Sequence, residues 1–144
     1  MSSAPPPIPY QPKRTRIDIF SAVLRARREF GGSKIAIVDG DERELSYNEI
    51  VRAAFALGSA IKKRTRKGES IGIMLPTGAG AVIAFLSVLA AGRVPAMLNF
   101  TAGAANLKSA MKAAQVSKVL TAHRFVELRS LEPLVESLES VADI

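Results

Sequence analysis

No charged side chain occurs between Ser70 and Gly92, and this apolar stretch constrains the fold more than any other feature of the sequence. A continuous helix of that length could cross a bilayer, which needs roughly 20 apolar residues. Pro76 and the Thr-Gly pair after it interrupt the stretch, so the sequence predicts a buried strand at Ile71–Leu75 and a separate helix at Ala79–Ala91. Such a helix would span about 20 Å, short of the roughly 30 Å hydrocarbon core of a membrane. We therefore expect a strand and a helix within a folded domain.

Strand-like and helix-like segments alternate along the chain after this stretch. We expect strands at 94–98 and 118–121, and helices at 104–114, 124–128 and 131–138. Alternation of this kind requires crossover connections, which make the strands parallel and place the connecting helices on the faces of the sheet. The predicted fold class is α/β, with a parallel-rich sheet flanked by helices. The strands at 71–75 and 94–98 should pair side by side.

The segment before the apolar stretch has patterns of its own. A helix is expected at 17–30, followed by a hairpin of strands at 34–39 and 43–45. Ser46 and Glu49 have the spacing of a capping box, in which each side chain accepts a hydrogen bond from the backbone amide of the other residue. The helix that this box opens should end near Arg64.

Residues 1–16 contain five of the eight prolines, together with Lys13, Arg14 and Arg16. Proline lacks the amide donor that a helix needs, so this segment is expected to be a disordered, Pro-rich basic tail. It lacks the apolar core of a secretory signal peptide. The expected division of the chain is a tail at 1–16 and a folded part at 17–144.

Composition argues against a self-contained hydrolase or metalloenzyme. The chain has no cysteine and a single histidine, His123, which excludes a disulfide framework, a thiol nucleophile and a Cys-ligated zinc site. No aspartate or glutamate occurs between Glu69 and Glu127. The most apolar part of the chain therefore offers neither a carboxylate base nor an oxygen cage for a hard cation.

Two local motifs could carry chemistry, and neither is complete. Thr77–Val82 (TGAGAV) follows a strand and opens a helix, as a dinucleotide-binding loop does. Its third glycine position holds Ile83, and no acid that could bind a ribose follows about 20 residues on. His123 has a hydroxyl nearby in Thr121, but nothing else in the chain completes a catalytic triad.

Positive charge is concentrated in the first half of the chain. Residues 1–67 hold 14 lysines and arginines against 7 acids, whereas residues 68–144 hold 6 of each. The densest cluster, Lys62–Lys67, falls at the end of the predicted helix, where the helix dipole stabilises cations. A solvated helix end is therefore sufficient to explain it, although an anionic membrane surface or an acidic partner would also suit this charge.

A small membrane-associated protein is the alternative hypothesis, with Lys62–Lys67 contacting anionic lipid and the apolar 70–92 stretch entering the membrane. Nucleic acid is not an expected partner, because Tyr10 and Tyr47 are the only tyrosines, tryptophan is absent and no groove-reading motif occurs. The absence of cysteine is compatible with the reducing cytoplasm. We expect a cytoplasmic protein, with peripheral attachment at the inner membrane left open.

Three motifs occur in an order that is typical of one enzyme superfamily. They are LSYNEI at Leu45–Ile50, GESIGIMLP at Gly68–Pro76 and FLSVLAAGRVPAMLN at Phe85–Asn99. Over residues 17–144 the chain resembles the first third of the large domain of adenylate-forming (AMP-binding) enzymes, which include acyl-CoA synthetases, luciferase and peptide-synthetase adenylation domains. The stretch Gly92–Asn106 is most similar to bacterial acyl-[acyl carrier protein] synthetases, often fused to a 2-acylglycerophosphoethanolamine acyltransferase. Thr77 departs from the asparagine usual in the family, and the acid a few places later is absent.

The resemblance implies a ligase that activates a fatty acid with ATP and Mg, and passes the acyl group to a carrier-protein or CoA thiol. The family's phosphate-binding loop, its ribose-binding acid and its C-terminal catalytic lysine have no counterpart here. We therefore assign no catalytic, cofactor-binding or metal-binding residue to this chain. It is expected to be an incomplete, N-terminal portion of the large domain, inactive alone, whose partner is the missing remainder of the ligase in the same or an adjacent chain.

Overall fold

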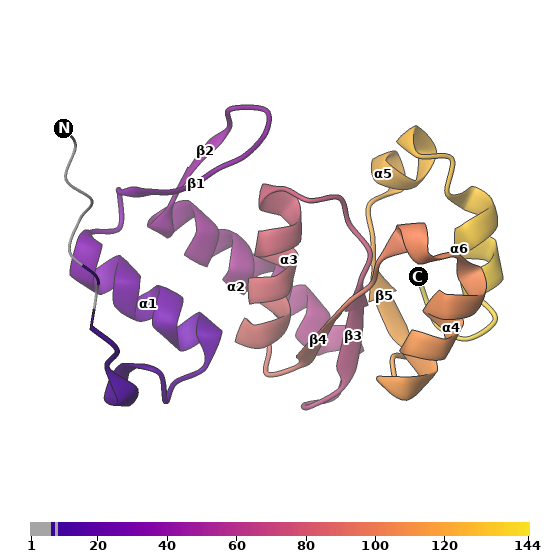
Figure 1. Cartoon of the computed structure of the whole chain (residues 1–144), viewed down its shortest axis with the longest axis horizontal. Coiled ribbons are helices and arrows are strands. Elements are labelled where there is room, and N and C mark those ends of the chain that lie inside the picture. The colour runs from indigo at the N-terminus through magenta and orange to yellow at the C-terminus, as the bar shows by residue number, and fades with distance from the viewer. Residues whose placement is uncertain (1–6, 8) are drawn as a thin grey trace.

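A computed structural model describes residue 7 and residues 9–144 (Figure 1). Strands and helices alternate along the second half of the chain, as the sequence predicts, and the predicted α/β class is confirmed. The elements in chain order are η1 (Pro12–Arg14), α1 (Ile19–Phe30), β1 (Ile35–Val38), β2 (Glu44–Ser46), α2 (Tyr47–Arg64), β3 (Ser70–Ile73), α3 (Ala79–Ala90), β4 (Val94–Met97), η2 (Phe100–Ala102), α4 (Ala104–Ala113), β5 (Lys118–Leu120), α5 (His123–Leu128) and α6 (Glu132–Leu138).

A three-stranded parallel sheet with the order β4-β3-β5 forms the centre of the molecule. Ile71 of β3 lies opposite Pro95 of β4, so the expected pairing of these two segments is confirmed. Proline cannot donate a hydrogen bond to a neighbouring strand, and Pro95 accordingly lies on a strand at the edge of this sheet. β1 and β2 form a separate antiparallel hairpin.

Helices cover both faces of the parallel sheet. On one face, Ile71 and Ile73 pack against α2 and α3, and on the other Met74 packs with residues of α4, α5 and α6 (Figure 1). Between the two isoleucines, Gly72 faces the second layer. A Cβ atom at Gly72 would lie 2.8 Å from Leu98 Cδ1, so this position has no space for a side chain.

α1 and the β1–β2 hairpin lie outside α2 and α3. Phe20 of α1 and Leu45 of β2 join a buried cluster with Ile50, Ala54 and Leu86. Ser46 and Glu49 form the predicted capping box, in which the Ser46 amide donates to Glu49 Oε2 at 2.8 Å and the Glu49 amide donates to Ser46 Oγ at 3.3 Å. α2 therefore begins where the sequence predicts and runs to Arg64.

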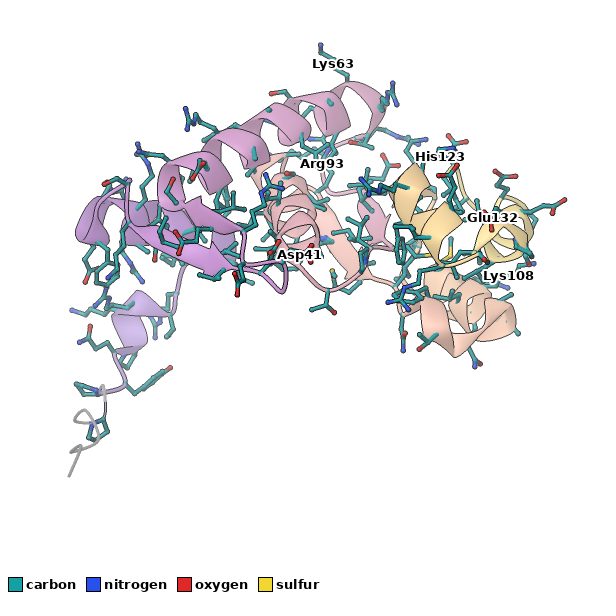
Figure 2. All side chains as sticks on the ribbon, turned by 90° about the horizontal axis from the view of Figure 1, so that it is seen from above. Asp41, Lys63, Arg93, Lys108, His123 and Glu132 are labelled. Carbon is teal, nitrogen blue, oxygen red and sulfur yellow. The ribbon has the colours of Figure 1, made fainter. Side chains whose placement is uncertain are left out.

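Arg93 fixes the other end of α2 from the turn between α3 and β4 (Figure 2). Its Nε donates to Thr65 Oγ1 at 2.9 Å, and its terminal nitrogens donate to the backbone carbonyls of Thr65 and Ala91. These carbonyls lie at helix ends, where the backbone has no partner of its own. The guanidinium thus ties the end of α2 to the end of α3.

The proline-rich segment, expected to be a disordered tail, contains one short helix among its described residues. Pro12–Arg14 form a 3-10 helix, with Pro12 in the first turn. The fixed φ of proline is compatible with the first turn of a helix, where its missing amide costs no hydrogen bond. Arg14 also forms an ion pair with Glu29 of α1 at 2.6 Å. The remaining tail prediction falls partly on residues 1–6 and 8, which lie outside the described residues.

The apolar stretch forms β3 and α3, as predicted from its internal proline. Ile73 and Val88 within it are fully buried. Within the described part of the chain, no helix is both long and apolar enough to cross a membrane.

Candidate functional site

A groove of about 510 Å³ lies at the carboxyl end of the parallel sheet. It is lined by three segments: the hairpin turn at 39–41, the β3–α3 connection at 75–81 and residues 122–129 around α5. Ligands of open α/β sheets bind outside the carboxyl ends of the strands, so this carboxyl-edge groove is the candidate site. The segments that line it, the hairpin turn, the first turn of α3 and α5, lie at the top of Figure 1.

The incomplete glycine motif lines this groove. α3 begins after Gly78, which provides no side-chain cap, and the first intrahelical bond runs from the Val82 amide to the Gly78 carbonyl at 3.3 Å. The helix residues before Val82, whose amides have no partner within the helix, belong to the groove lining. This part of the site therefore supplies backbone donors at the positive end of a helix dipole.

Four charged side chains line the same groove, two from each side. Asp39 and Asp41 come from the hairpin turn (Figure 2 labels Asp41), and Arg124 and Arg129 come from α5 and its end. Asp39 Oδ1 accepts hydrogen bonds from the amides of Asp41 and Arg43, each at 3.1 Å, and so holds the turn. Within residues 9–144 none of the four forms an ion pair.

His123 and Thr121 lie at the end of β5, but their side chains are engaged elsewhere. The Thr121 hydroxyl donates to the carbonyl of Met74 at 2.8 Å and thereby holds β5 against β3. The His123 side chain is 90% exposed, and its Nε2 lies 3.1 Å from Glu127 Oε1. In the part of the chain that the structure describes, no group of three or more His, Asp and Glu side chains could hold a metal ion.

Three carboxyl groups have a lowered pKa, and hydrogen bonds are the cause in each case. The Ser21 hydroxyl lowers the pKa of Asp18, the Ser46 hydroxyl lowers that of Glu49, and the Arg66 amide lowers that of Glu69. Asp18 and Glu49 cap helices, while Glu69 connects the end of α2 to Ser117, whose hydroxyl donates to its Oε1 at 3.0 Å. None of them lines the carboxyl-edge groove, so these shifts report local structure rather than catalysis.

A second groove of about 620 Å³ lies between α2 and β5. Its lining includes the apolar residues Ile61, Ile71 and Leu120 and the cations Arg64 and Lys118. Asp143 also lines this groove. It forms a parallel bridge and a 3.2 Å ion pair with Lys118, and its amide donates to the Ser117 carbonyl at 2.9 Å. The outer edge of β5 is therefore paired at a single isolated bridge, with Asp143.

None of the four charged residues of the carboxyl-edge groove is among the functional candidates expected from the sequence. Asp39 directly follows β1, and Arg124 lies four residues after the end of β5, so position after a strand is the one pattern that could have identified these two. The spacing of apolar residues along the sequence does not predict that the hairpin turn lies beside α5. The two are separated by most of the chain and meet only through the packing of the sheet.

Comparison with known proteins adds an independent result. The family model described as "AMP-binding enzyme" matches residues 24–144. The anthranilate CoA ligase AuaEII, solved with anthranoyl-AMP, superposes with a TM-score of 0.70 at 20% identity, over 84% of this chain and 22% of that one. The N-terminal domain of FACL13 from Mycobacterium tuberculosis gives a TM-score of 0.70 at 15% identity, over 86% of this chain and 30% of that one.

The o-succinylbenzoate CoA synthetase MenE from Bacillus subtilis, solved with the acyl-adenylate intermediate OSB-AMP, is similar as well. Its TM-score is 0.69 at 18% identity, over 84% of this chain and 30% of that one. At these identities the three structures establish a shared fold. The chain spans less than a third of the length of each of them.

Proposed function

The chain belongs to the AMP-binding enzyme family, and from this membership we propose that it forms the N-terminal part of the large domain of an ATP-dependent acid–thiol ligase. The observation that carries the proposal is the family match over residues 24–144, in a fold shared with ligases solved with acyl adenylates. In such a ligase a carboxylate oxygen attacks the α-phosphate of ATP and pyrophosphate leaves. A thiol then attacks the acyl carbon, forming a thioester and releasing AMP.

We propose a fatty acid as the substrate, with a carrier-protein or CoA thiol as the acceptor. The support is the similarity of Gly92–Asn106 to acyl-[acyl carrier protein] synthetases. Two of the solved relatives are named for other acids, anthranilate and o-succinylbenzoate. Aryl acids therefore belong in any test of this proposal.

The described residues do not by themselves fit ATP and Mg. Among them there is no cluster of three potential metal ligands, and the carboxyl-edge groove has Arg124 and Arg129 as its only cations. A phosphate-binding loop with lysine, as the family uses, does not occur in this sequence. We therefore propose that this chain contributes a framework, and that the residues that contact ATP and the acid lie in the remainder of the ligase.

The purified 144-residue chain should release no pyrophosphate when ATP, Mg and a fatty acid are supplied together. Release above a control without protein would contradict the framework role. A chain that continues the reading frame, or an adjacent gene, should encode the lysine-bearing phosphate loop, and DNA sequencing downstream of the Ile144 codon tests this.

The complete ligase distinguishes the substrate proposals. With a panel of fatty acids, anthranilate and o-succinylbenzoate, the fatty acids should support pyrophosphate release and the aryl acids should not. Activity with aryl acids alone would remove the fatty-acid proposal and leave the family assignment intact. Thioester formation with CoA, compared with a carrier protein, then identifies the acceptor.

A further inference from the structure

One face of α2 is exposed from Arg52 to Lys63. Its residues recur at helical spacing, and all are exposed: Arg52, Phe55, Ala56, Ser59, Lys62 and Lys63. The opposite face, with Ile50, Ala54 and Ile61, is buried in the core. Figure 2 shows α2 along the outer side of the molecule, with Lys63 pointing away from the body.

This outward face of α2 is basic, and none of its own residues is acidic. Glu49 is the one acidic residue of the helix, and its carboxylate is held by Ser46 in the capping box. Exposed Arg66 and Lys67 extend the charge past the helix end. The ion pairs found among residues 9–144 involve Arg14, Lys118 and His123, so none of the cations of α2 is neutralised.

Phe55 lies in the middle of the same face with 48% of its surface exposed. Its ring packs edge-on against Phe20, with the ring centroids 5.2 Å apart, so its position is fixed by the core. Interfacial helices combine lysine and arginine with apolar side chains that enter the membrane. The apolar face of α2 packs in the core, so Phe55 is the one large apolar side chain that the exposed face offers to a membrane.

We propose that the outward face of α2 docks this protein on an anionic lipid surface. The side chains of this face, from Arg52 to Lys63, form a row about 17 Å long, which suits a flat surface. The cations would lie among the headgroups, and Phe55 would enter the interface. Nucleic acid suits this face less well, because binding of single strands depends on several aromatic rings that stack successive bases, and Phe55 is the one aromatic residue of this face. The docking face acts independently of the ligase chemistry.

Vesicle flotation of the full 144-residue chain tests the proposal. The chain should float with vesicles of phosphatidylcholine and phosphatidylglycerol and stay behind with vesicles of phosphatidylcholine alone. High salt should release it, because screening shortens the reach of the cations. The double variant Lys62→Gln/Lys63→Gln should bind about 25-fold more weakly, since each cation near an anionic surface contributes about fivefold.

A matched variant separates this face from net charge. Lys108→Gln/Lys112→Gln on α4 removes the same charge, and Lys108 lies on a different side of the molecule from Lys63 (Figure 2). It should change the affinity less than twofold. Equal losses in both double variants would overturn the docking face, and so would equal binding to neutral vesicles.

A third pair of variants tests the apolar contact. Phe55→Ser should weaken vesicle binding, whereas Leu128→Ser, at a residue that is 73% exposed outside this face, should not. Because Phe55 also touches Phe20, circular dichroism must show that Phe55→Ser is folded, and the lysine variants decide the question if it is not. Binding to single-stranded nucleic acid but not to anionic vesicles would overturn the proposal in favour of a polyanion site.

Discussion

The two halves of the chain are stabilised in different ways. In residues 9–67 both long helices begin with a side-chain cap, from Asp18 for α1 and from Ser46 for α2. In residues 68–144 none of the four α-helices has a side-chain hydrogen bond at its N-cap. The largest fully buried side chains all lie in this second half: Ile71, Ile73, Met74, Leu107, Met111, Leu138, Val88 and Ser87. Local hydrogen bonds therefore organise the first half, and burial around the sheet organises the second.

The two halves also form different functional surfaces, the basic outward face of α2 and the carboxyl-edge groove. The excess positive charge lies in the first half, on helices that expose a long face to solvent. The second half supplies most of the carboxyl-edge groove, to which the first half adds the hairpin turn at 39–41. Variants that act on the core of one half and on the caps of the other should therefore have effects of different size.

Leu138→Ala should have the largest effect. Leu138 of α6 is fully buried and packs in the cluster that covers one face of the sheet. Removing its methyl groups leaves a cavity, and such a change costs about 2–5 kcal/mol. Urea unfolding followed by circular dichroism measures the loss. Leu128→Ala, at an exposed position of α5, is the control and should change the unfolding free energy by less than about 0.5 kcal/mol.

Gly72→Ala should have the next largest effect. The added methyl group would lie 2.8 Å from Leu98 and 3.1 Å from both Val116 and Val119, so three side chains must move. Overpacking of this kind costs about 1–3 kcal/mol. Gly80→Ala adds the same methyl group to the first turn of α3, where nothing lies within 4 Å. There the better helix propensity of alanine should leave stability equal or higher, and a loss as large as that of Gly72→Ala would contradict the packing argument.

Ser46→Ala should have a smaller effect, confined to the first half. It removes the cap of α2 and the hydroxyl partner of Glu49, a change that costs about 0.5–2 kcal/mol. Ser109→Ala, at an exposed position inside α4, removes a hydroxyl without a capping role. If both substitutions lower the urea midpoint equally, capping does not account for the start of α2.

The sequence predicted the elements well where local chemistry defines them. The spacing of Ser46 and Glu49 located the start of α2, and Pro76 separated β3 from α3, because both features act within a few residues. Parallel pairing of β3 with β4 followed from their connection through one helix. The 3-10 helix at Pro12–Arg14 was missed, since it is held in part by the distant Glu29.

The candidate site was harder to predict than the fold. The hairpin turn and α5 meet at the carboxyl-edge groove through tertiary packing, so no spacing along the chain relates Asp41 to Arg124. Arg93 is similar, since its contacts with Thr65 and Ala91 depend on how α2 packs on α3. Those helices approach closely at Gly58, where an added Cβ would lie 3.0 Å from the Ser87 carbonyl. A single sequence does not show which glycine marks such an approach.

The smallest expected effect is a loss of stability in acid that depends on the caps. Hydrogen bonds from Ser21, Ser46 and the Arg66 amide lower the pKa values of Asp18, Glu49 and Glu69 below their ordinary values of 3.8 for aspartate and 4.5 for glutamate. A carboxyl group with a lowered pKa in the folded state stabilises the fold above the ordinary pKa, and this contribution disappears as the pH falls through the lowered value.

The urea midpoint should therefore hold steady from neutral pH to the ordinary pKa range and decline below it. Glu49→Gln should lower the midpoint near neutral pH and make the decline in acid shallower, because one of the three groups no longer titrates. Glu136→Gln provides the control, since this exposed residue of α6 accepts no side-chain hydrogen bond within residues 9–144. If the wild-type and Glu49→Gln curves stay parallel through the acid range, the capping box does not contribute to the pH dependence, and the first half of the chain depends on its caps less than its geometry indicates.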